Sequence, residues 1–299
     1  MRRSSSMIRR LIAASKGPAQ SSVAVRELAN AYIAGETVDE VAEVARRLRD
    51  KGLDISLHYL AREDERRAPQ HLLEAAAVLG DDVVGAEFSV RPSSLGLRES
   101  ASVARQRLDE FCGAVEAADA HVTLEMQAVP DYLPTLDLYR DVVSDHPELA
   151  VTVPVNVRRA ERDIRRLAED GARLRLCVGS YPVPRSQGFS SEHEKSRALV
   201  RSVRAVMESH GTLLLATHDP RIIAITQELA ARNEKGRDDV EFQMLYGVRP
   251  LEQRRLADTG NRSRTYLPFG PGWYEYLATR VAARPRTLWS YTRALLDKR

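Results

Sequence analysis

The chain alternates short apolar segments with longer amphipathic ones, and this pattern constrains its fold more than any other feature. Eight short segments are rich in Val, Leu and Ile, as buried strands are: residues 54–60, 83–90, 121–126, 149–157, 173–181, 212–217, 240–245 and 263–267. Between them apolar residues recur at helical spacing, as at Leu108, Phe111 and Val115. Each gap is long enough for the crossover that a parallel strand needs. The sequence therefore predicts an α/β fold, a (β/α)8 barrel of the TIM type.

The residues ahead of the first predicted strand indicate a helix packed on the barrel. Thr37 and Glu40 have the spacing of a capping box, and Val41, Val44 and Leu48 follow on one stripe. We expect three parts: a basic tail at 1–21, N-terminal helices at 22–53 packed on the barrel, and the barrel at 54–299. The apolar and basic stretch 285–299 predicts a further helix that caps the barrel, or alternatively one that binds lipid.

Composition excludes several classes of protein. Lys and Arg number 45 against 42 Asp and Glu, too close to balance to indicate a nucleic-acid partner. Cys112 and Cys177 have no ligand-like spacing, so we expect no metal site and a reducing cytoplasm. No apolar run reaches the roughly 20 residues of a membrane span. The first 26 residues carry no acid, which leaves two alternatives: peripheral contact with the inner membrane face, or a solvated tail.

Polar and aromatic residues gather where the predicted strands end, which is where barrels of this kind carry their chemistry. These residues are His58, Arg91, Glu125, Gln127, Asn156, Tyr181, Thr217, His218, Asp219, Tyr246 and Tyr266. Arg91 and Arg280 have tyrosines nearby, a combination that suits a small amino or hydroxy acid held by its carboxylate. For any one of these residues, a structural hydrogen bond at the barrel rim is the alternative.

Two of these strand ends have features suited to phosphate. Gly179 ends one strand, where backbone can approach a flat ring or a phosphate closely. Thr217 or Asp219 is placed to cap a helix that begins at Pro220, and the backbone amides there suit a pyrophosphate. The chain has no GxGxxG or Walker sequence, so a nucleotide would bind without either device.

Four runs of sequence resemble, in this order along the chain, the proline dehydrogenase family. They are Leu-Cys-Val-Gly-Ser-Tyr (176–181), Leu-Ala-Thr-His-Asp-Pro (215–220), Glu-Phe-Gln-Met-Leu-Tyr-Gly-Val-Arg (241–249), and Tyr-Leu-Pro-Phe-Gly (266–270) followed by Trp-Tyr-Glu-Tyr (273–276). The similarity extends from about Val23 to Leu296, and Glu-Phe-Gln-Met-Leu-Tyr-Gly is its most specific part. It implies a flavin-binding (β/α)8 barrel that carries FAD and oxidises L-proline to 1-pyrroline-5-carboxylate, with a hydride passing to flavin N5 and electrons to a membrane quinone.

The resemblance also implies roles for individual residues. Arg175 matches an arginine near flavin N5, Gly179 and Ser180 match an FAD loop, and Thr217 and His218 match a pair at the nucleotide part. The expected cofactor-binding residues are Arg175, Val178, Gly179, Ser180, Thr217, His218 and Gln243. The expected substrate-binding residues are Arg91, Leu245, Tyr266, Tyr276, Thr279 and Arg280, with Tyr181 and Glu125 as the catalytic pair. For Glu125, a base is one interpretation and a partner for Arg91 or Tyr181 is the other.

The chain departs from the family pattern where a carboxylate clamp is expected. Thr279 replaces the first arginine of a pair, and Arg62 stands where a glutamate would meet it. Glu125 replaces an aspartate, Pro154 a flavin-binding glutamine, and Val178 a lysine. Arg91, where the family has lysine, could compensate because its planar fork can hold both carboxylate oxygens. Two alternatives stay open: a flavoenzyme acting on another cyclic or secondary amine, and a non-catalytic barrel that has lost FAD.

Overall fold

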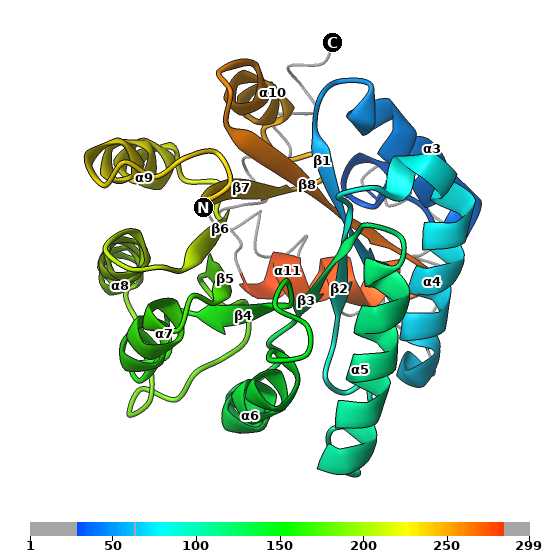
Figure 1. Cartoon of the computed structure of the whole chain (residues 1–299), viewed down its shortest axis with the longest axis horizontal. Helices are drawn as coiled ribbons and strands as arrows, with labels where there is room; N and C mark the ends of the chain where they lie inside the picture. Colours follow the sequence, from blue (N-terminus) through cyan, green and yellow to red (C-terminus); the bar gives the residue numbers. More distant parts are fainter. Residues whose placement is uncertain (1–28, 63, 284–299) are drawn as a thin grey trace, which may run out of the picture.

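Eight parallel strands form a closed barrel in the computed structural model, which describes residues 29–62 and 64–283 (Figure 1). They are β1 (Asp54–Tyr59), β2 (Glu87–Val90), β3 (His121–Leu124), β4 (Ala150–Pro154), β5 (Arg173–Cys177), β6 (Thr212–Ala216), β7 (Val240–Leu245) and β8 (Arg262–Phe269). Each strand pairs in parallel with the next, and β8 pairs with β1 from Asp54↔Arg264 to Tyr59↔Phe269. The predicted (β/α)8 barrel of the TIM type is confirmed.

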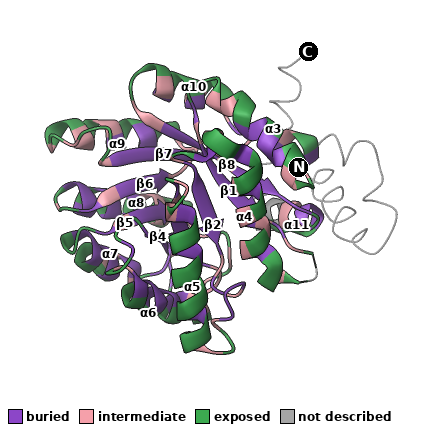
Figure 2. Cartoon of the chain, turned by 45° about the vertical axis from the view of Figure 1, so that its right-hand side comes forward, coloured by how far each residue is buried: buried purple, intermediate pink, exposed green. Residues whose placement is uncertain are grey.

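Helices surround the barrel and cover the outer face of its sheet. They are α3 (Val38–Arg49), α4 (Ala68–Leu79), α5 (Ala101–Glu116), α6 (Tyr132–Val142), α7 (Ala160–Glu169), α8 (Glu192–Met207), α9 (Pro220–Arg232) and α10 (Pro250–Asp258), and a further helix, α11 (Trp273–Ala283), follows β8. Short 3-10 turns are η2 (Glu65–Arg67), η3 (Gly80–Val83) and η4 (Val129–Asp131). Figure 2 shows buried strands inside a ring of helices that expose their outer faces. The apolar core fills the space between sheet and helices, as burial of each amphipathic stripe requires.

Several strand boundaries differ from the predicted ones, whereas β7 matches its prediction and β8 extends beyond it at both ends. β2 begins at Glu87, because Val83 belongs to the turn η3 and Gly85 adopts a left-handed φ of 68°. β4 and β5 end at Pro154 and Cys177, before the predicted 157 and 181, since the chain turns after each. At β4 and β5, therefore, the apolar composition locates the strand but continues into the loop that follows it.

The helix predicted at the capping box is present as α3. Thr37 Oγ1 accepts a hydrogen bond from the Glu40 amide (3.3 Å), and Glu40 Oε2 accepts one from the Thr37 amide (3.1 Å). Val41 and Val44 are buried in the main core, so α3 packs on the barrel. The predicted tail (1–21) and the predicted helix at 285–299 lie outside the described residues, and the proposed division into three parts stays a prediction.

α11 follows the carboxyl end of β8 and packs at that end of the barrel. The Gly272 amide donates to the Leu60 carbonyl (2.8 Å), and a Cβ at Gly272 would overlap the Ala61 carbonyl oxygen, so glycine permits this close approach. α11 then contributes to a small separate apolar cluster formed by Ala29, Ile33, Leu60, Trp273 and Tyr274. In Figure 1, α11 crosses the opening of the barrel. Within 29–62 and 64–283, no helix has both the length and the apolar character to span a membrane.

Candidate active site

A cavity of about 210 Å³ lies at the carboxyl ends of β3 to β8. It is smaller than the 300–1,000 Å³ typical for drug-sized ligands, so it suits a small molecule or one ring of a larger one. Most of the predicted site residues line it: Glu125, Arg175, Val178, Gly179, Ser180, Tyr181, Thr217, His218, Gln243, Leu245 and Tyr266. Residues from segments far apart in the chain therefore meet where the sequence predicts.

Arg175, on β5, is the most highly connected side chain of the cavity. It is only 3% exposed. Its guanidinium donates to four side chains: Nε to Gln243 Oε1 (2.7 Å), Nη1 to Ser89 Oγ (3.0 Å) and Glu125 Oε1 (2.9 Å), and Nη2 to Glu87 Oε1. Burial opposes the charge, but the two carboxylates raise the pKa of Arg175 above its ordinary value. Arg175 is thus a permanent cation held in one orientation.

Glu125 follows β3 and faces both Arg175 and Tyr266. Its Oε1 accepts from Arg175 (2.9 Å) and from the Tyr266 hydroxyl (3.1 Å). Burial alone would raise the pKa of Glu125, but the charge of Arg175 and the bond from Tyr266 hold this pKa below its ordinary value. The hydrogen-bond partners of Glu125 are Arg175 and Tyr266, both at Oε1, and the charge of Arg91 also acts on this carboxylate; its interpretation as a partner for Arg91 or Tyr181 stays a prediction. An ionised carboxylate with a lowered pKa is also a weak general base.

Two residues that line the cavity carry buried hydroxyls with no hydrogen-bond partner among the described residues. Tyr181 Oη and Thr152 Oγ1 are both buried. Leaving a hydroxyl buried and unpaired costs about 1–3 kcal/mol, which a ligand with polar atoms would recover. Burial raises the pKa of Tyr181, so its phenol remains protonated and can donate.

Sequence reasoning missed Thr152 as a cavity residue. The signal was present, because Thr152 precedes Pro154 by two positions and alternate residues of a strand share a face. The structure places both residues on β4 at the cavity, with Thr152 opposite Arg175 in the strand register.

The loop after β5 is held by Asn156. The Gly179 amide donates to Asn156 Oδ1 (2.7 Å), and a Cβ at Gly179 would lie 2.9 Å from the same oxygen and 3.1 Å from Pro154 Cβ. The close approach for which Gly179 is needed is therefore made within the protein, to Asn156. Its predicted role at the cofactor stays a prediction.

The loop after β6 is fixed by hydrogen bonds at His218. The Leu245 amide donates to His218 Nε2 (3.0 Å), so this nitrogen carries no proton, and Arg249 Nη1 donates to the His218 carbonyl (2.8 Å). Of the two predicted caps of α9, Thr217 and Asp219, the structure shows Asp219, which accepts from the Arg221 amide (2.9 Å). The imidazole ring is thereby oriented at the cavity wall.

Arg91 and Thr279, two of the residues expected to bind the substrate, are not among the residues that line the cavity. Arg91 Nη1 instead donates to Glu65 Oε1 (3.1 Å), with both side chains about one third exposed. Thr279 is exposed and its hydroxyl donates to the Glu275 carbonyl of its own helix (2.8 Å).

Two further predicted substrate residues, Tyr276 and Arg280, belong to α11, as Thr279 does. Tyr276 is half-buried and packs against the apolar cluster that includes Leu60 and Trp273, so it too lies outside the cavity wall. Arg280 is part of the same helix, and its side chain lies outside the described part of the chain.

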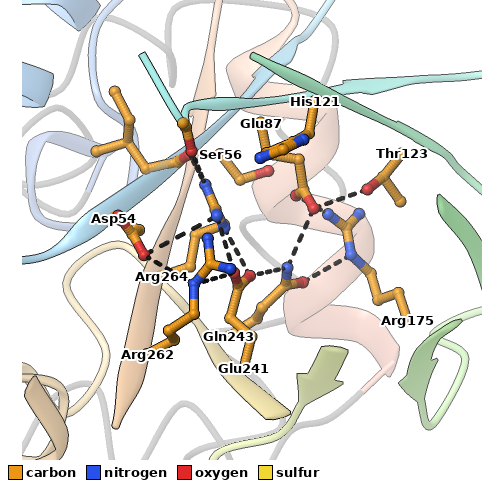
Figure 3. A network of polar contacts seen from close by, with 12 residues as sticks. Asp54, Ser56, Glu87, His121, Thr123, Arg175, Glu241, Gln243, Arg262 and Arg264 are labelled. Atoms are coloured by element: carbon orange, nitrogen blue, oxygen red, sulfur yellow. Dashed lines mark hydrogen bonds and ion pairs between the residues drawn. The ribbon is translucent and has the colours of Figure 1, made fainter. Parts of the chain in front are cut away.

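Beneath the cavity, buried ionic side chains continue down the interior of the barrel (Figure 3). Gln243 Nε2 donates to Glu87 Oε2 (3.2 Å) and to Glu241 Oε1 (2.7 Å). Glu241 pairs with Arg264 through two bonds of 2.6 and 2.8 Å, and Arg264 Nη1 also donates to the Ile55 carbonyl (2.7 Å). Burial opposes ionisation, but Arg264 lowers the pKa of Glu241 to about 2. In the part that the structure describes, no cluster of three or more acidic, His or Cys side chains is placed to hold a metal.

Comparison with known proteins agrees with this geometry. No protein-family model matches the chain. The chain is 28% identical over 275 residues to proline dehydrogenase 1 of Bacillus subtilis, which covers 90% of this chain and 91% of that protein. It is 26% identical over 272 residues to a proline dehydrogenase of Deinococcus radiodurans, which covers 87% of each.

Solved structures show the same fold. Proline utilization A from Bdellovibrio bacteriovorus, in a crystal structure of the protein inactivated by N-propargylglycine, superposes with a TM-score of 0.78 at 18% identity over 87% of this chain. Proline utilization A from Corynebacterium freiburgense superposes with a TM-score of 0.72 at 12% identity over 98% of this chain. The chain spans about a third of the length of each of these two proteins.

Proposed function

We propose that this chain, a divergent relative of the proline dehydrogenases, is an FAD-dependent oxidoreductase that converts L-proline to 1-pyrroline-5-carboxylate in proline catabolism. The proposal rests on one observation about where the family-like segments lie in the fold. Segments that resemble the family, and that lie within the stretch shared with the named relatives, meet around one cavity at the carboxyl ends of the barrel strands.

The residues of the cavity fit a flavin by their chemistry. Thr152 and Tyr181 offer buried hydroxyls that lack partners, and Arg175 offers a buried positive charge. Tyr266 adds an aromatic ring, with the Arg175 guanidinium carbon 5.7 Å from the centre of that ring. These are groups that hold a flat ring edged with polar atoms. Bound FAD would supply the oxidation by accepting a hydride from the substrate carbon beside nitrogen.

The chain's own residues would orient the substrate and determine which protonation state of its amine binds. Glu125 is ionised and faces the cavity, so it attracts the ammonium form of the amine and orients it. Leu245 forms part of the wall, and Tyr181 stays protonated and donates. Glu125, the one carboxylate in the described cavity wall, has a lowered rather than a raised pKa, so the proton released from the ammonium passes to solvent.

The substrate carboxylate needs a cation, and Arg91 is the candidate outside α11. It lies at the end of β2 and its charge acts on Glu125, although its guanidinium now contacts Glu65. Binding of proline through Arg91 therefore requires that Glu65 give up this contact. The electrons would pass on to a quinone, with the protein in the cytoplasm or at the inner face of the membrane.

One observation favours an alternative substrate, another cyclic or secondary amine with the same cofactor. Among the described residues Arg175 is the one arginine that lines the cavity, and it already contacts two carboxylates. The described cavity wall thus offers no arginine that is not already paired with carboxylates, and the lack of a cation for a substrate carboxylate favours an amine over an amino acid. A barrel that has lost FAD is the third possibility.

Absorbance separates these three possibilities in one preparation. Purified protein with flavin absorbance at about 450 nm supports both enzyme proposals, whereas colourless protein that does not bind added FAD overturns them. Anaerobic addition of L-proline should bleach that absorbance at lower concentration than pyrrolidine, which has the same ring without the carboxylate. The reverse order would favour the alternative amine.

N-propargylglycine provides an independent test of the same cavity. It inactivated the Bdellovibrio bacteriovorus protein, so we expect time-dependent loss of activity here, slowed by an excess of L-proline. Inactivation that proline does not slow would contradict binding of both compounds at one site.

A further inference from the structure

Glu87 belongs to neither the cavity wall nor any predicted set of site residues, yet it contacts the cation of the site directly. It begins β2 inside the barrel and is 2% exposed. Its Oε1 accepts from Arg175 Nη2, and its Oε2 accepts from Thr123 Oγ1 (2.7 Å) and Gln243 Nε2 (3.2 Å). Both carboxylate oxygens thus accept hydrogen bonds, and Figure 3 shows the Glu87 carboxylate beside the Arg175 guanidinium and joined to Thr123 by a dashed line.

Gln243 holds the same guanidinium from a second side. Its amide oxygen accepts from Arg175 Nε (2.7 Å), while its amide nitrogen donates to Glu87 and to Glu241. These three bonds fix which end of the amide carries the nitrogen. Because Glu241 is itself paired with Arg264, the position of Gln243 is set by the ionic pair deeper in the barrel.

The charges around Arg175 do not cancel. Two buried carboxylates, Glu87 and Glu125, contact one guanidinium, and Glu125 faces the cavity while Glu87 lies behind it. A buried carboxylate is retained only where charge and hydrogen bonds compensate it, and Glu87 has both. Removal of the Glu87 charge would leave Arg175 more positive toward the cavity, in an interior where charges are weakly screened.

We propose that Glu87 is a positioning residue for Arg175: it orients the guanidinium beneath the cavity and offsets its charge, so that the field at a ring bound there depends on Glu87. The identity of that ring rests on the proposed function, but the positioning of Arg175 does not. The tests below therefore include one that requires no cofactor.

The first test measures the reduction potential of bound FAD in Glu87→Gln. Because the more positive Arg175 stabilises a reduced, anionic ring, we expect a more positive potential, with several-fold more reduced flavin at a fixed solution potential. Glu87→Asp keeps the charge and should return the potential toward that of the unmodified protein. An unchanged potential in Glu87→Gln would overturn the charge part of the proposal.

Glu241→Gln is the matched control. It removes a carboxylate from the same barrel interior and keeps an oxygen that can accept from Gln243, but Glu241 contacts Arg264 instead of Arg175. We expect its potential to stay close to that of the unmodified protein, even where its unfolding midpoint falls. Equal shifts in both glutamine variants would show a general loss of barrel structure and would contradict a specific role for Glu87.

The second test observes Arg175 itself, with protein labelled with 15N-arginine and free of cofactor. A buried Nε–H bonded to Gln243 should exchange slowly with water, and its signal is assigned by its absence in Arg175→Lys. We expect Glu87→Gln to shift this signal and speed its exchange at least several-fold, and Glu241→Gln to leave it in place. Should Glu87→Gln fail to fold, Gln243→Met removes the other contact and is expected to expose the Nε–H. A protected, unshifted signal in the variants would overturn the positioning role.

Discussion

The interior of the barrel and its carboxyl rim use the same ionic chemistry at different depths. Arg264 and Glu241 pair through two bonds with side chains 1% and 2% exposed, whereas Arg91 and Glu65 pair at the rim with side chains 33% and 35% exposed. Water screens the rim pair but does not reach the interior pair. The interior pair is thus part of the fold, while the rim pair can separate at little cost, as a site that admits a substrate requires.

The largest effect is expected when the interior pair is broken. Arg264→Met leaves Glu241 buried without its partner and should lower the free energy of unfolding by about 3–5 kcal/mol. Denaturant unfolding followed by circular dichroism measures this change. Arg262, half-buried at the same end of the barrel, provides the control, because Arg262→Met removes only ion pairs of 3.6 Å or longer, to Asp54, Asp238 and Glu241. If Arg264→Met and Arg262→Met lowered the free energy of unfolding equally, the special contribution of the interior pair would be contradicted.

Breaking the rim pair should affect the ligand more than the fold. In Arg91→Ala we expect the free energy of unfolding to change by less than about 1 kcal/mol. We expect bound FAD to be kept and L-proline to bind about thirty-fold more weakly, as loss of a carboxylate anchor implies. Anaerobic titration followed by flavin absorbance measures both the bound FAD and the affinity for L-proline. Unchanged affinity for proline would remove Arg91 from the substrate site.

Glu65→Gln completes this pair of rim variants. It frees Arg91 from a carboxylate while keeping a side chain of the same size, so proline should bind at least as tightly as in the unmodified protein. Weaker binding would mean that Glu65 supports the site and does not compete with the substrate for Arg91.

The smallest effect concerns a third, half-buried cluster, far from the cavity. His146 Nδ1 lies 2.8 Å from Glu116 Oε2 and its Nε2 lies 3.1 Å from Asp109 Oδ1. Burial opposes the charged ring, but the bonds to Glu116 and Asp109 raise the pKa of His146 above its ordinary value of about 6.5. Because the pKa of His146 is higher in the folded chain than in the unfolded chain, the protonated ring stabilises the fold. This stabilisation is complete at a pH below the pKa of the unfolded chain, and it is lost as the pH rises through the pKa of the folded chain.

The pH dependence of the free energy of unfolding tests whether the pKa of His146 is raised in the folded chain. The free energy of unfolding should fall by up to about 1 kcal/mol as pH rises from near 6 through the folded pKa of His146, and His146→Gln should flatten that part of the curve. A rise in stability with pH that the variant removes would contradict the raised pKa.

The site illustrates how far the sequence predicts function. The segments at 176–181, 215–220 and 241–249 predicted which residues gather at the cavity, and the structure places most of them there. The sequence did not predict the partners of Glu125 and Arg91, nor the contribution of Thr152. A hydrogen bond such as that between Arg175 and Glu87 joins residues 88 positions apart, and no local pattern records it.

The amino-acid order alone determined the eight strands, the helices between them and the capped start of α3. These depend on apolar periodicity and on contacts between near neighbours in the chain, which any segment carries with it. Closure of the barrel decided the rest: which carboxylates share Arg175, where the strands end, and that Arg91 contacts Glu65. Such pairings depend on which side chains the strand register brings within about 3 Å inside a medium that excludes water, and that is a property of the assembled fold.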